Sequence, residues 1–373
     1  MHIVYFFTYG YSLESWESAG ILDREIRIFH ELIKKYNLKF TFITYGDKSD
    51  LKFNLGKNIN IIPIYTLRKK SNSKFINLIK SFFLSKVIFR KINKLNVIKQ
   101  NQLMGSWVSI LFKLKYKKPL YIRTGYDMFL FSLKDQKSIF KILLYYLLTQ
   151  FTFLFSDLYT VTSASDYKFL NRFFIFKRKK LAIRYNWVES NNYKNLSDRS
   201  SKEILSVGRL EKQKNYQHLI KSIAETDFTL HIVGEGKERE IIESLAKKLS
   251  VNIKFLGILN NKELMNLYSN YKYFISTSNF EGNPKALLEA MSSGCIVIAR
   301  DIPNNREIIN DHHNGILFND DNINLNELLK NIKNIGNIEN LSLNATKHTK
   351  LNNSIEKLSE LIYLDFVSLN KPK

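Results

Sequence analysis

Apolar residues recur along the chain in two patterns, short continuous runs typical of buried strands and runs with the 3.6-residue spacing of helices. In the first half the patterns alternate, with a strand at residues 2–7, a helix at 21–33 and a strand at 39–44. The series continues with strands at 60–64, 120–123 and 158–162 and a helix at 139–155. Repeated strand–helix–strand units predict an α/β fold with a parallel sheet covered by helices on both faces.

The alternation restarts after a polar segment at residues 190–201, which has no apolar periodicity and is predicted to be a linker. Beyond it, the pattern predicts strands at 203–207, 229–233, 253–256, 273–276 and 295–299, and helices at 215–223, 238–249, 262–269, 284–293 and 343–364. We therefore expect domains at 1–189 and 203–345, a linker at 190–202 and a C-terminal helix at 346–373. Two such domains in tandem leave a cleft between them, a common place for a ligand.

Composition supports two globular domains. The 373 residues are 45% hydrophobic and 24% charged, enough to bury two cores. The single cysteine, Cys295, excludes a disulfide framework and fits a reducing compartment. The chain opens on a strand without the basic segment of a signal peptide, so we expect a cytoplasmic protein. The longest apolar stretch, at 139–155, is too short and too polar to predict a transmembrane helix.

The net charge of +23 is unevenly divided. Residues 1–190 carry 33 Lys and Arg against 12 Asp and Glu, whereas residues 191–373 carry 24 against 22. Such a positive field attracts phosphate-rich partners, either nucleic acid or an anionic membrane surface. The other interpretation is a biased composition, although bias alone would charge both halves alike.

Candidate chemistry gathers where strands of the second domain end, because ligands of parallel sheets bind at the carboxyl ends of the strands. One strand stops at Gly208, and two cations, Arg209 and Lys214, flank the loop that follows. A guanidinium and an ammonium in these places would hold phosphate oxygens, although a solvated basic loop remains the alternative. A second strand end, I-V-G-E-G at 232–236, lacks the third glycine of a dinucleotide fingerprint, so we expect a structural turn there.

The most specific strand end has the sequence S-N-F-E-G-N-P-K-A-L-L-E-A-M. Pro284 suits a first helical turn, Gly282 lets a ligand approach the backbone, and the helix N-terminus can receive an anion. Glu281 lies just outside that N-terminus and Glu289 about one and a half turns inside it. Carboxylates on either side of an anion site suit a nucleotide sugar, whose hydroxyls flank its phosphates. Otherwise, Glu281 is a helix-dipole carboxylate and Glu289 an exposed helix residue.

These motifs resemble those of retaining, family-4-like glycosyltransferases, also called glycosyl transferases group 1. Glu281 and Glu289, separated by seven residues, match the family's E-x7-E motif, and Arg209 and Lys214 match its G-R-L-x-x-x-K motif. The segments I-V-G-E-G, F-L-G at 255–257 and N-W-V-E at 186–189 also fall in the family's order. The resemblance is dense in the second half of the chain and thin in the first.

The resemblance implies a GT-B fold, in which two Rossmann-like domains face each other across a cleft and the last helix crosses back to the first domain. It implies a transfer without metal or cofactor from a nucleotide-diphosphate sugar, UDP- or GDP-linked. By position, Arg209 and Lys214 would neutralise the departing diphosphate, Glu281 would bind hydroxyls of the donor sugar, and Glu289 the ribose. The remaining donor-binding candidates are Gly208, Gly282, Asn283, Pro284, Lys285, Ala286 and Leu287.

The first domain departs from the family pattern. Many relatives carry His-Gly-x-Asp at the end of a first-domain strand, where this chain has T-G-Y-D after Arg123. Because a threonine cannot act as an imidazole does, Arg123, Thr124 and Asp127 are the acceptor-side candidates. The family's double-glycine loop is reduced to Ala19-Gly20, which adds Gly20 to them.

Two basic segments of the first domain suit a membrane surface. Residues 74–99 alternate Phe, Leu, Val and Ile with Lys and Arg, as interfacial helices do, and the alternative is a solvated surface helix. The run K-R-K-K at 177–180 is the second candidate for contact with lipid headgroups.

The residues and the resemblance together predict a bacterial retaining glycosyltransferase acting on a glycan or a polyprenyl-pyrophosphate-linked acceptor in capsule, O-antigen or lipopolysaccharide synthesis. We expect it at the inner face of the cytoplasmic membrane, held by the basic first domain and without a specific nucleic-acid partner. Three alternatives stay open: a nucleic-acid-binding protein, a same-fold enzyme such as a sugar-nucleotide epimerase or glycan phosphorylase, and an inactive donor-binding scaffold.

Overall fold

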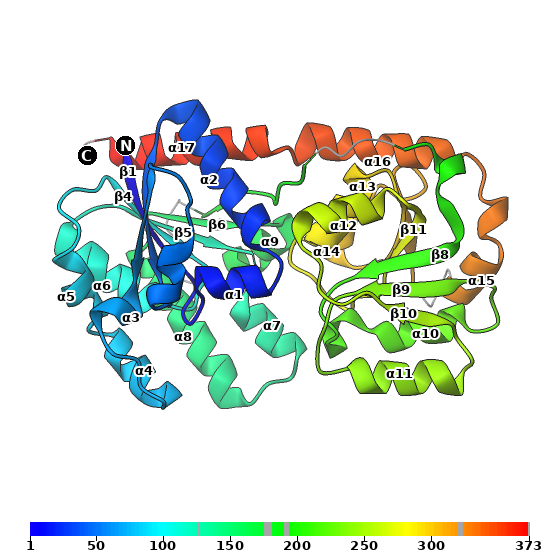
Figure 1. Ribbon diagram of the computed structural model, residues 1–373, viewed down its shortest axis with the longest axis horizontal. Helices are drawn as coiled ribbons and strands as arrows, with labels where there is room; N and C mark the ends of the chain where they lie inside the picture. The colour runs from blue at the N-terminus through cyan, green and yellow to red at the C-terminus, as the bar shows by residue number, and fades with distance from the viewer. Residues whose placement is uncertain (126, 175–180, 190–193, 320–323, 372–373) are drawn as a thin grey trace. The chain divides into compact units, whose positions relative to one another are not determined.

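A computed structural model describes residues 1–125, 127–174, 181–189, 194–319 and 324–371 (Figure 1). They form two compact units, one of Met1–Tyr185 with Leu358–Lys373 and the other of Asn186–Lys357. The basic run at 177–180 and part of the predicted linker lie outside the described residues.

In the described part of the first unit, seven parallel strands form a sheet in the order β3-β2-β1-β4-β5-β6-β7. This order is doubly wound, with its switch point between β1 and β4. The strands are β1 (His2–Phe6), β2 (Lys39–Thr44), β3 (Ile59–Pro63), β4 (Val97–Asn101), β5 (Leu120–Thr124), β6 (Leu158–Val161) and β7 (Leu181–Ile183). The helices are α1 (Leu13–Ser18), α2 (Leu22–Tyr36), α3 (Ile64–Leu67), α4 (Lys74–Ser81), α5 (Leu84–Phe89), α6 (Ser106–Tyr116), α7 (Met128–Lys134), α8 (Ile139–Phe155) and α9 (Ala164–Phe173).

The second unit repeats the plan with six described parallel strands in the order β10-β9-β8-β11-β12-β13. Here the switch point lies between β8 and β11. The strands are β8 (Ser200–Val207), β9 (Thr229–Val233), β10 (Ile253–Phe255), β11 (Tyr271–Ser276), β12 (Ile296–Arg300) and β13 (Ile316–Phe318). The helices are α10 (Tyr216–Ile223), α11 (Arg239–Lys248), α12 (Asn261–Tyr268), α13 (Lys285–Ser292), α14 (Pro303–Arg306), α15 (Leu325–Lys330) and α16 (Ile338–Asn352).

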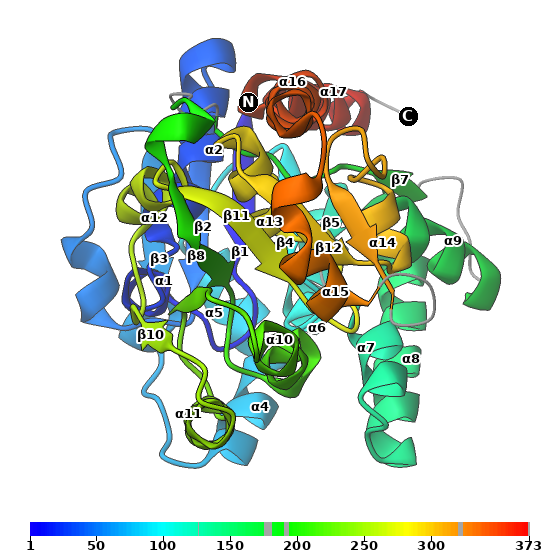
Figure 2. The same cartoon turned by 90° about the vertical axis from the view of Figure 1, so that its right-hand side faces the viewer.

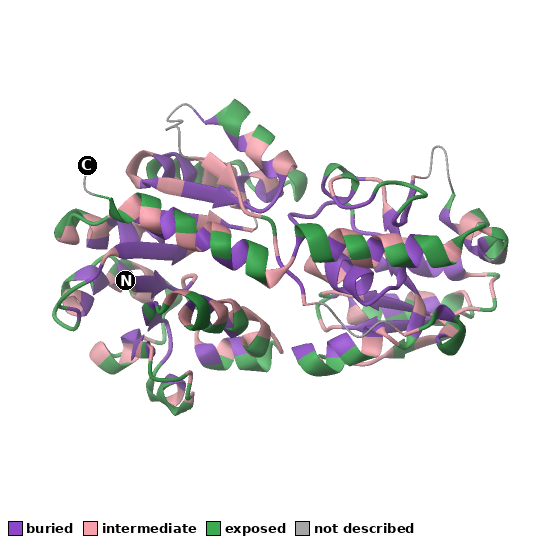
Figure 3. Cartoon of the chain, turned by 90° about the horizontal axis from the view of Figure 1, so that it is seen from above, coloured by how far each residue is buried: buried purple, intermediate pink, exposed green. Residues whose placement is uncertain are grey.

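Side chains of the second sheet alternate between two hydrophobic cores, as strand geometry requires. Ile204 on β8 packs with α10, α11 and α15, whereas its neighbour Leu205 packs with α12 and α13. Ile275 and Phe274 on β11 divide in the same way. Figure 3 shows the strands largely buried and the exposed residues on helices and loops. The predicted α/β fold with sheets covered on both faces is therefore confirmed.

The C-terminal segment is helical, as predicted, but it consists of α16 and a separate helix, α17 (Ile355–Asn370). From Leu358 onward α17 belongs to the first unit, which confirms the return of the last helix to the first domain. Asp365 on α17 accepts two hydrogen bonds from the guanidinium of Arg184, at 2.9 and 2.6 Å. The rings of Tyr363 and Tyr36 stack with centroids 3.9 Å apart.

Residues 74–99, whose pattern resembles that of interfacial helices, do not form one continuous helix. This segment divides into α4 and α5, and its last three residues begin β4. Lys99 is 5% exposed, and its ammonium lies 5.0 Å from the ring centroid of Tyr121 and 5.5 Å from that of Phe366. Burial lowers the pKa of Lys99 to about 7. The alternation of apolar and basic residues near residue 99 is therefore that of a β-strand, in which every second side chain lies on the same face of the sheet. The side chain of Lys99 faces the core.

Helix α8 has the bounds predicted from its apolar run. Among the described residues, no helix combines the length and apolar character needed to cross a bilayer.

Candidate functional site

The two motif-bearing loops of the second unit meet at the switch point of its sheet. One loop follows β8 and the other follows β11, and these two strands pair side by side. Because the strands are parallel, their carboxyl ends lie at the same edge of the sheet, where such folds bind ligands. The topology thus brings together residues about 70 positions apart in sequence.

Backbone and side-chain hydrogen bonds join the two loops. The N–H of Asn279 donates to the carbonyl of Gln213 at 2.9 Å, and the Thr277 hydroxyl contacts the carbonyls of Lys214 and Asn215, both at 3.0 Å. Asn215 adopts a left-handed conformation with φ 52°, which ends the short 3₁₀ turn Lys212–Lys214. The Gln213 side chain donates to the carbonyl of Phe280 at 2.8 Å. These contacts hold the side chain of Lys214 against the second loop.

The central feature of the site is an ion pair between Lys214 and Glu281. Lys214 Nζ lies 2.5 Å from Glu281 Oε1, and the two side chains are 19% and 9% exposed. Gln213 Nε2 lies 3.5 Å from the other carboxylate oxygen. A cation and a carboxylate held together at low exposure offer one group for an anion and one for hydroxyls.

Gly208 lies directly beside the side chain of Lys214. A Cβ at position 208 would lie 2.9 Å from Cε of Lys214 and 3.3 Å from the Tyr216 hydroxyl. That hydroxyl donates to the Gly208 carbonyl at 3.1 Å. Gly208 therefore lets the lysine stem cross the backbone on its way to Glu281.

The glycines of I-V-G-E-G support the same loop, in agreement with their interpretation as a structural turn. Gly234 has φ +135°, and a Cβ there would lie 2.1 Å from the carbonyl oxygen of Gly208. At Gly236 a Cβ would lie 2.4 Å from the Leu210 carbonyl oxygen. The turn after β9 is thus packed directly against the loop that holds Lys214.

Arg209 lies apart from the ion pair. Its side chain is 65% exposed and donates to Glu211 at 3.1 Å. The structure therefore brings Lys214 and Glu281 together and leaves Arg209 at the solvent-facing side of the same loop.

The N-terminus of α13 continues the site. Pro284 is the N-cap, so the helix begins one residue later than predicted, and no side chain caps the first-turn N–H groups. Asn283 is 6% exposed, and its side-chain nitrogen has no hydrogen-bond partner. Asn304 donates to the carbonyl of Gly282 at 2.5 Å. Backbone and amide donors at this end of α13 suit an anionic ligand.

Asn186, the first residue of N-W-V-E, fixes the same segment. Its backbone N–H donates to Asn283 Oδ1 at 3.0 Å, and its side chain donates to the Asn283 carbonyl at 2.8 Å. Asn353 donates in turn to the Asn186 carbonyl at 2.9 Å. Two motifs 97 residues apart are thus directly bonded, which their order in the sequence does not reveal.

Glu289 is a buried residue of α13, 3% exposed, and not the exposed helix residue that was the alternative interpretation. The hydroxyl of Tyr268 on α12 lies 3.3 Å from Glu289 Oε2. Lys285, Ala286 and Leu287 form the first turn of the same helix, and the Lys285 ammonium lies 5.7 Å from the ring centroid of Trp187.

The acceptor-side candidates of the first unit cluster at the carboxyl end of β5. Arg123 donates to the carbonyl of Arg184 at 2.8 Å, and burial lowers the pKa of its guanidinium. Thr124 is buried at the strand end. Asp127 caps α7 by accepting from the N–H of Leu130 at 2.6 Å. Its second oxygen is buried without a hydrogen-bond partner, and burial raises the pKa of Asp127 to about 6.

Gly20 is distant in sequence from these residues and lies at the end of α1. It has φ 68° and follows the C-cap of α1, where its N–H donates to Glu17 and that of Ile21 to Trp16. This bonding is the usual glycine termination of a helix. The glycine in the loop after β1 is Gly10, with φ 84°, which the sequence interpretation missed.

Four further residues of the site were also missed, namely Gln213, Asn279, Asn304 and Tyr268. Their amide and hydroxyl groups join segments distant in sequence, so no local pattern distinguishes them. Among the described residues, no three His, Cys, Asp or Glu side chains gather as metal ligands would.

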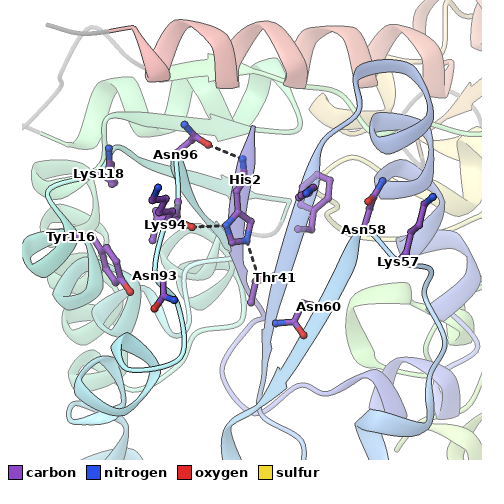
Figure 4. A pocket seen from close by; sticks show the side chains of 13 residues that line it. His2, Thr41, Lys57, Asn58, Asn60, Asn93, Lys94, Asn96, Tyr116 and Lys118 are labelled. Carbon is purple, nitrogen blue, oxygen red and sulfur yellow. Dashed lines mark hydrogen bonds between the residues drawn. The ribbon is translucent and has the colours of Figure 1, made fainter.

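A cavity of about 910 Å³ lies at the opposite, amino-terminal edge of the first sheet (Figure 4). The His2 ring lies in it, with Nδ1 2.6 Å from the Lys94 carbonyl and Nε2 2.8 Å from the Thr41 hydroxyl. Lys39, Lys57, Lys94 and Lys118 line it. Because its lining faces the amino ends of the strands, the cavity is separate from the candidate residues at their carboxyl ends.

Comparison with known proteins shows what the second half of the chain is similar to. The model of the family described as glycosyl transferases group 1 matches residues 188–351, which include Lys214, Glu281 and Glu289. The Campylobacter jejuni N-acetylgalactosamine-N,N'-diacetylbacillosaminyl-diphospho-undecaprenol 4-alpha-N-acetylgalactosaminyltransferase is 33% identical over 176 residues. That alignment covers 45% of this chain and 48% of the relative, about half of its length.

Solved structures extend the likeness of the fold to the whole chain. Sucrose-phosphate synthase from Thermosynechococcus elongatus superposes with a TM-score of 0.78 at 15% identity, covering 99% of both chains. Anabaena HepE in complex with UDP and glucose superposes with a TM-score of 0.74 at 16% identity, covering 99% of this chain and 100% of the other. Two doubly wound units with these likenesses define a GT-B protein. Residues 188–351, which carry Lys214, Glu281 and Glu289, are similar to the group 1 glycosyltransferases.

Proposed function

We propose that the protein is a retaining glycosyltransferase that moves a sugar from a nucleoside-diphosphate donor, UDP- or GDP-linked, to a glycan acceptor. The observation that carries the proposal is the Lys214–Glu281 ion pair beside the N-terminus of α13, within the segment that matches the family. A nucleotide sugar presents a diphosphate between two sets of hydroxyls, and this site offers donors to the anion and carboxylates to the hydroxyls.

In the proposed reaction, Lys214 is the principal cation for the departing diphosphate. Its ammonium exchanges Glu281 for phosphate oxygens when the donor binds, which frees the Glu281 carboxylate to accept hydrogen bonds from the sugar. Fixed charges that stabilise a leaving group lower a barrier by about 3 kcal/mol each. Arg209, on the exposed side of the loop, moves towards the same phosphates.

The rest of the donor is held by backbone and buried groups. The backbone N–H groups of Asn283, Lys285, Ala286 and Leu287, together with the side-chain amide nitrogen of Asn283, bind phosphate oxygens. Glu289, supported by Tyr268, binds the ribose hydroxyls. Fixed protein cations take the role that a metal ion plays in other transferases. The acceptor attacks the sugar on the same face that the diphosphate leaves, so no covalent nucleophile is required.

For the acceptor we propose a glycan on a polyprenyl pyrophosphate, in bacterial surface polysaccharide synthesis. The name of the Campylobacter relative includes a diphospho-undecaprenol, and the positive first domain suits both a pyrophosphate and an anionic membrane. Asp127, whose pKa of about 6 suits proton exchange near neutral pH, is the candidate to receive the acceptor's proton. We therefore propose that the protein acts at the inner face of the cytoplasmic membrane.

A thermal-shift screen against UDP, GDP, ADP, CMP and their sugar conjugates tests the donor class. A ligand that binds the folded state stabilises it by about 2.7 kcal/mol at a hundredfold excess over Kd. We expect a shift with one nucleoside-diphosphate family and, with its sugar conjugate, slow release of nucleoside diphosphate and an unchanged sugar. A changed sugar would identify an epimerase, and a nucleotide shift without any turnover on lipid-linked acceptors would identify a scaffold.

A further inference from the structure

Helix α8 of the first unit turns an apolar face to solvent. Its exposed large side chains are Ile139, Phe140, Leu143, Leu144, Leu147 and Phe151, with Ile139 83% and Phe140 76% exposed. At 100° per residue these six lie within an arc of about 140°. Apart from the exposed Lys141, its polar residues Thr149, Gln150 and Thr152 are buried on the protein side, where the Thr152 hydroxyl contacts that of Ser106 at 2.9 Å. This is the reverse of the polarity of a helix on a water-exposed surface.

Helix α4 and the two residues that follow it repeat this pattern. The exposed apolar side chains are Phe75, Ile76, Ile79, Phe82 and Phe83, with Phe75 70% exposed. They occupy an arc of about 120° on the helix, with Lys74 and Lys80 on either side of it. A narrow apolar face between lysines is typical of helices that lie in a membrane interface.

The two apolar faces belong to one surface, joined through α6. Trp107 on α6 stacks on Phe82 with ring centroids 5.8 Å apart and donates to the Ser81 hydroxyl at 2.8 Å. Ser106, its neighbour, contacts α8. Figures 1 and 2 both show α4 and the α7 end of α8 projecting in the same direction from the first unit. We call residues 74–83 and 139–151 the α4–α8 surface.

The charged residues around this surface are all positive over a long stretch of the chain. Residues 51–125, which include α4, α5 and α6, contain 17 Lys and Arg and neither Asp nor Glu. Lys69, Lys70 and Lys74 are exposed beside α4. A second copy of the chain docked face to face would bring these cations together, so the charge favours an anionic partner.

We propose that the α4–α8 surface inserts into the interface of an anionic phospholipid bilayer. The apolar side chains of both helices enter the boundary between headgroups and acyl chains, and the neighbouring lysines contact lipid phosphates. The mode of binding is thus insertion and not charge attraction alone. This inference rests on the proposed function in one respect only, namely that insertion would bring the first unit to a lipid-linked acceptor.

Vesicle flotation tests the insertion. The full-length protein is mixed with phosphatidylcholine vesicles containing 30% phosphatidylglycerol, or none, and compared with the Ile139→Ser/Phe140→Ser variant. We expect wild type to float with the anionic vesicles and the variant to partition about tenfold more weakly, because two large side chains no longer leave water. Leu351→Ser, at a comparably exposed leucine of α16 in the second unit, is the matched control and keeps wild-type partitioning.

Tryptophan fluorescence is a second readout, which reports how deeply the surface enters the bilayer. Trp107 is half-buried beside α4, so its fluorescence should be quenched by lipids brominated near the headgroup end of their acyl chains, and Trp107→Phe should remove that quenching. The nucleotide-induced thermal shift of each variant shows that it is folded and separates this proposal from that of the function. Equal flotation of wild type and the Ile139→Ser/Phe140→Ser variant, or no flotation of wild type, overturns the proposal. A dimer in solution that this variant dissociates would assign the surface to a second copy instead.

Discussion

Lys214 and Glu281 carry opposite charges at a place where water has little access. Removing one member of such a pair leaves the other unpaired, which costs more than replacing both. We expect Lys214→Met to lower the free energy of unfolding by about 3 kcal/mol, and the double variant Lys214→Met/Glu281→Gln to recover most of that loss. Urea unfolding followed by circular dichroism measures both. A double variant no more stable than the single one would contradict this account of the pair.

Asp127 is a capping residue whose second carboxylate oxygen is buried. Its pKa of about 6 lies above the ordinary value of 3.8, so its stabilising effect is complete below pH 3.8 and is lost as the pH rises through 6. Asparagine keeps the capping oxygen without the charge. We therefore expect Asp127→Asn to melt above wild type at pH 7.5, with the difference shrinking as the pH falls to 4. A difference independent of pH would show that ionisation of Asp127 is not its cause.

At the scale of elements, the turn after β9 and the loop after β8 are in backbone contact. Gly234→Ala places a methyl group 2.1 Å from the Gly208 carbonyl oxygen, so one of the two backbones must move. We expect a loss of about 3 kcal/mol in unfolding free energy together with weaker nucleotide binding. Gly257→Ala is the control, because its φ is also positive and no heavy atom lies within 4 Å of the added Cβ. A similar loss in both variants would mean that backbone strain alone is responsible.

Much of the fold follows from local pattern, and much of the site does not. The strands at 39–44 and 229–233 and the helix at 139–155 have the predicted bounds because apolar runs of these lengths are unambiguous. The division of segment 74–99 into two short helices and the start of β4 was not predicted, because short helices and a strand that bears a lysine show the same alternation of apolar and basic residues. The meeting of Lys214 with Glu281 follows from strand order and motif resemblance together. The bonds of Asn186 and Asn304 to the second loop depend on side-chain amides that no periodicity identifies.

At the scale of the whole molecule, the first unit is completed by the far end of the chain. The Arg184–Asp365 pair and the stacking of Tyr36 on Tyr363 hold α17 in that unit. We expect Asp365→Ala to lower the unfolding free energy by about 3 kcal/mol, because the half-buried guanidinium loses its carboxylate. Glu360→Ala, at an exposed carboxylate of the same helix, should stay within about 0.5 kcal/mol of wild type. Equal unfolding midpoints for the two variants would show that the pair does not hold α17.

The central claim is that Lys214 binds the donor diphosphate and Glu281 the donor sugar. Isothermal titration calorimetry with the nucleoside diphosphate and with its sugar conjugate separates the two roles. We expect the double variant Lys214→Met/Glu281→Gln, which is more stable than Lys214→Met alone, to bind the nucleoside diphosphate at least about tenfold more weakly. The reason is the loss of a charge-assisted contact. We expect Glu281→Gln alone to keep that affinity and to lose the added affinity for the sugar conjugate. Wild-type affinity of the double variant for the nucleoside diphosphate would contradict the account.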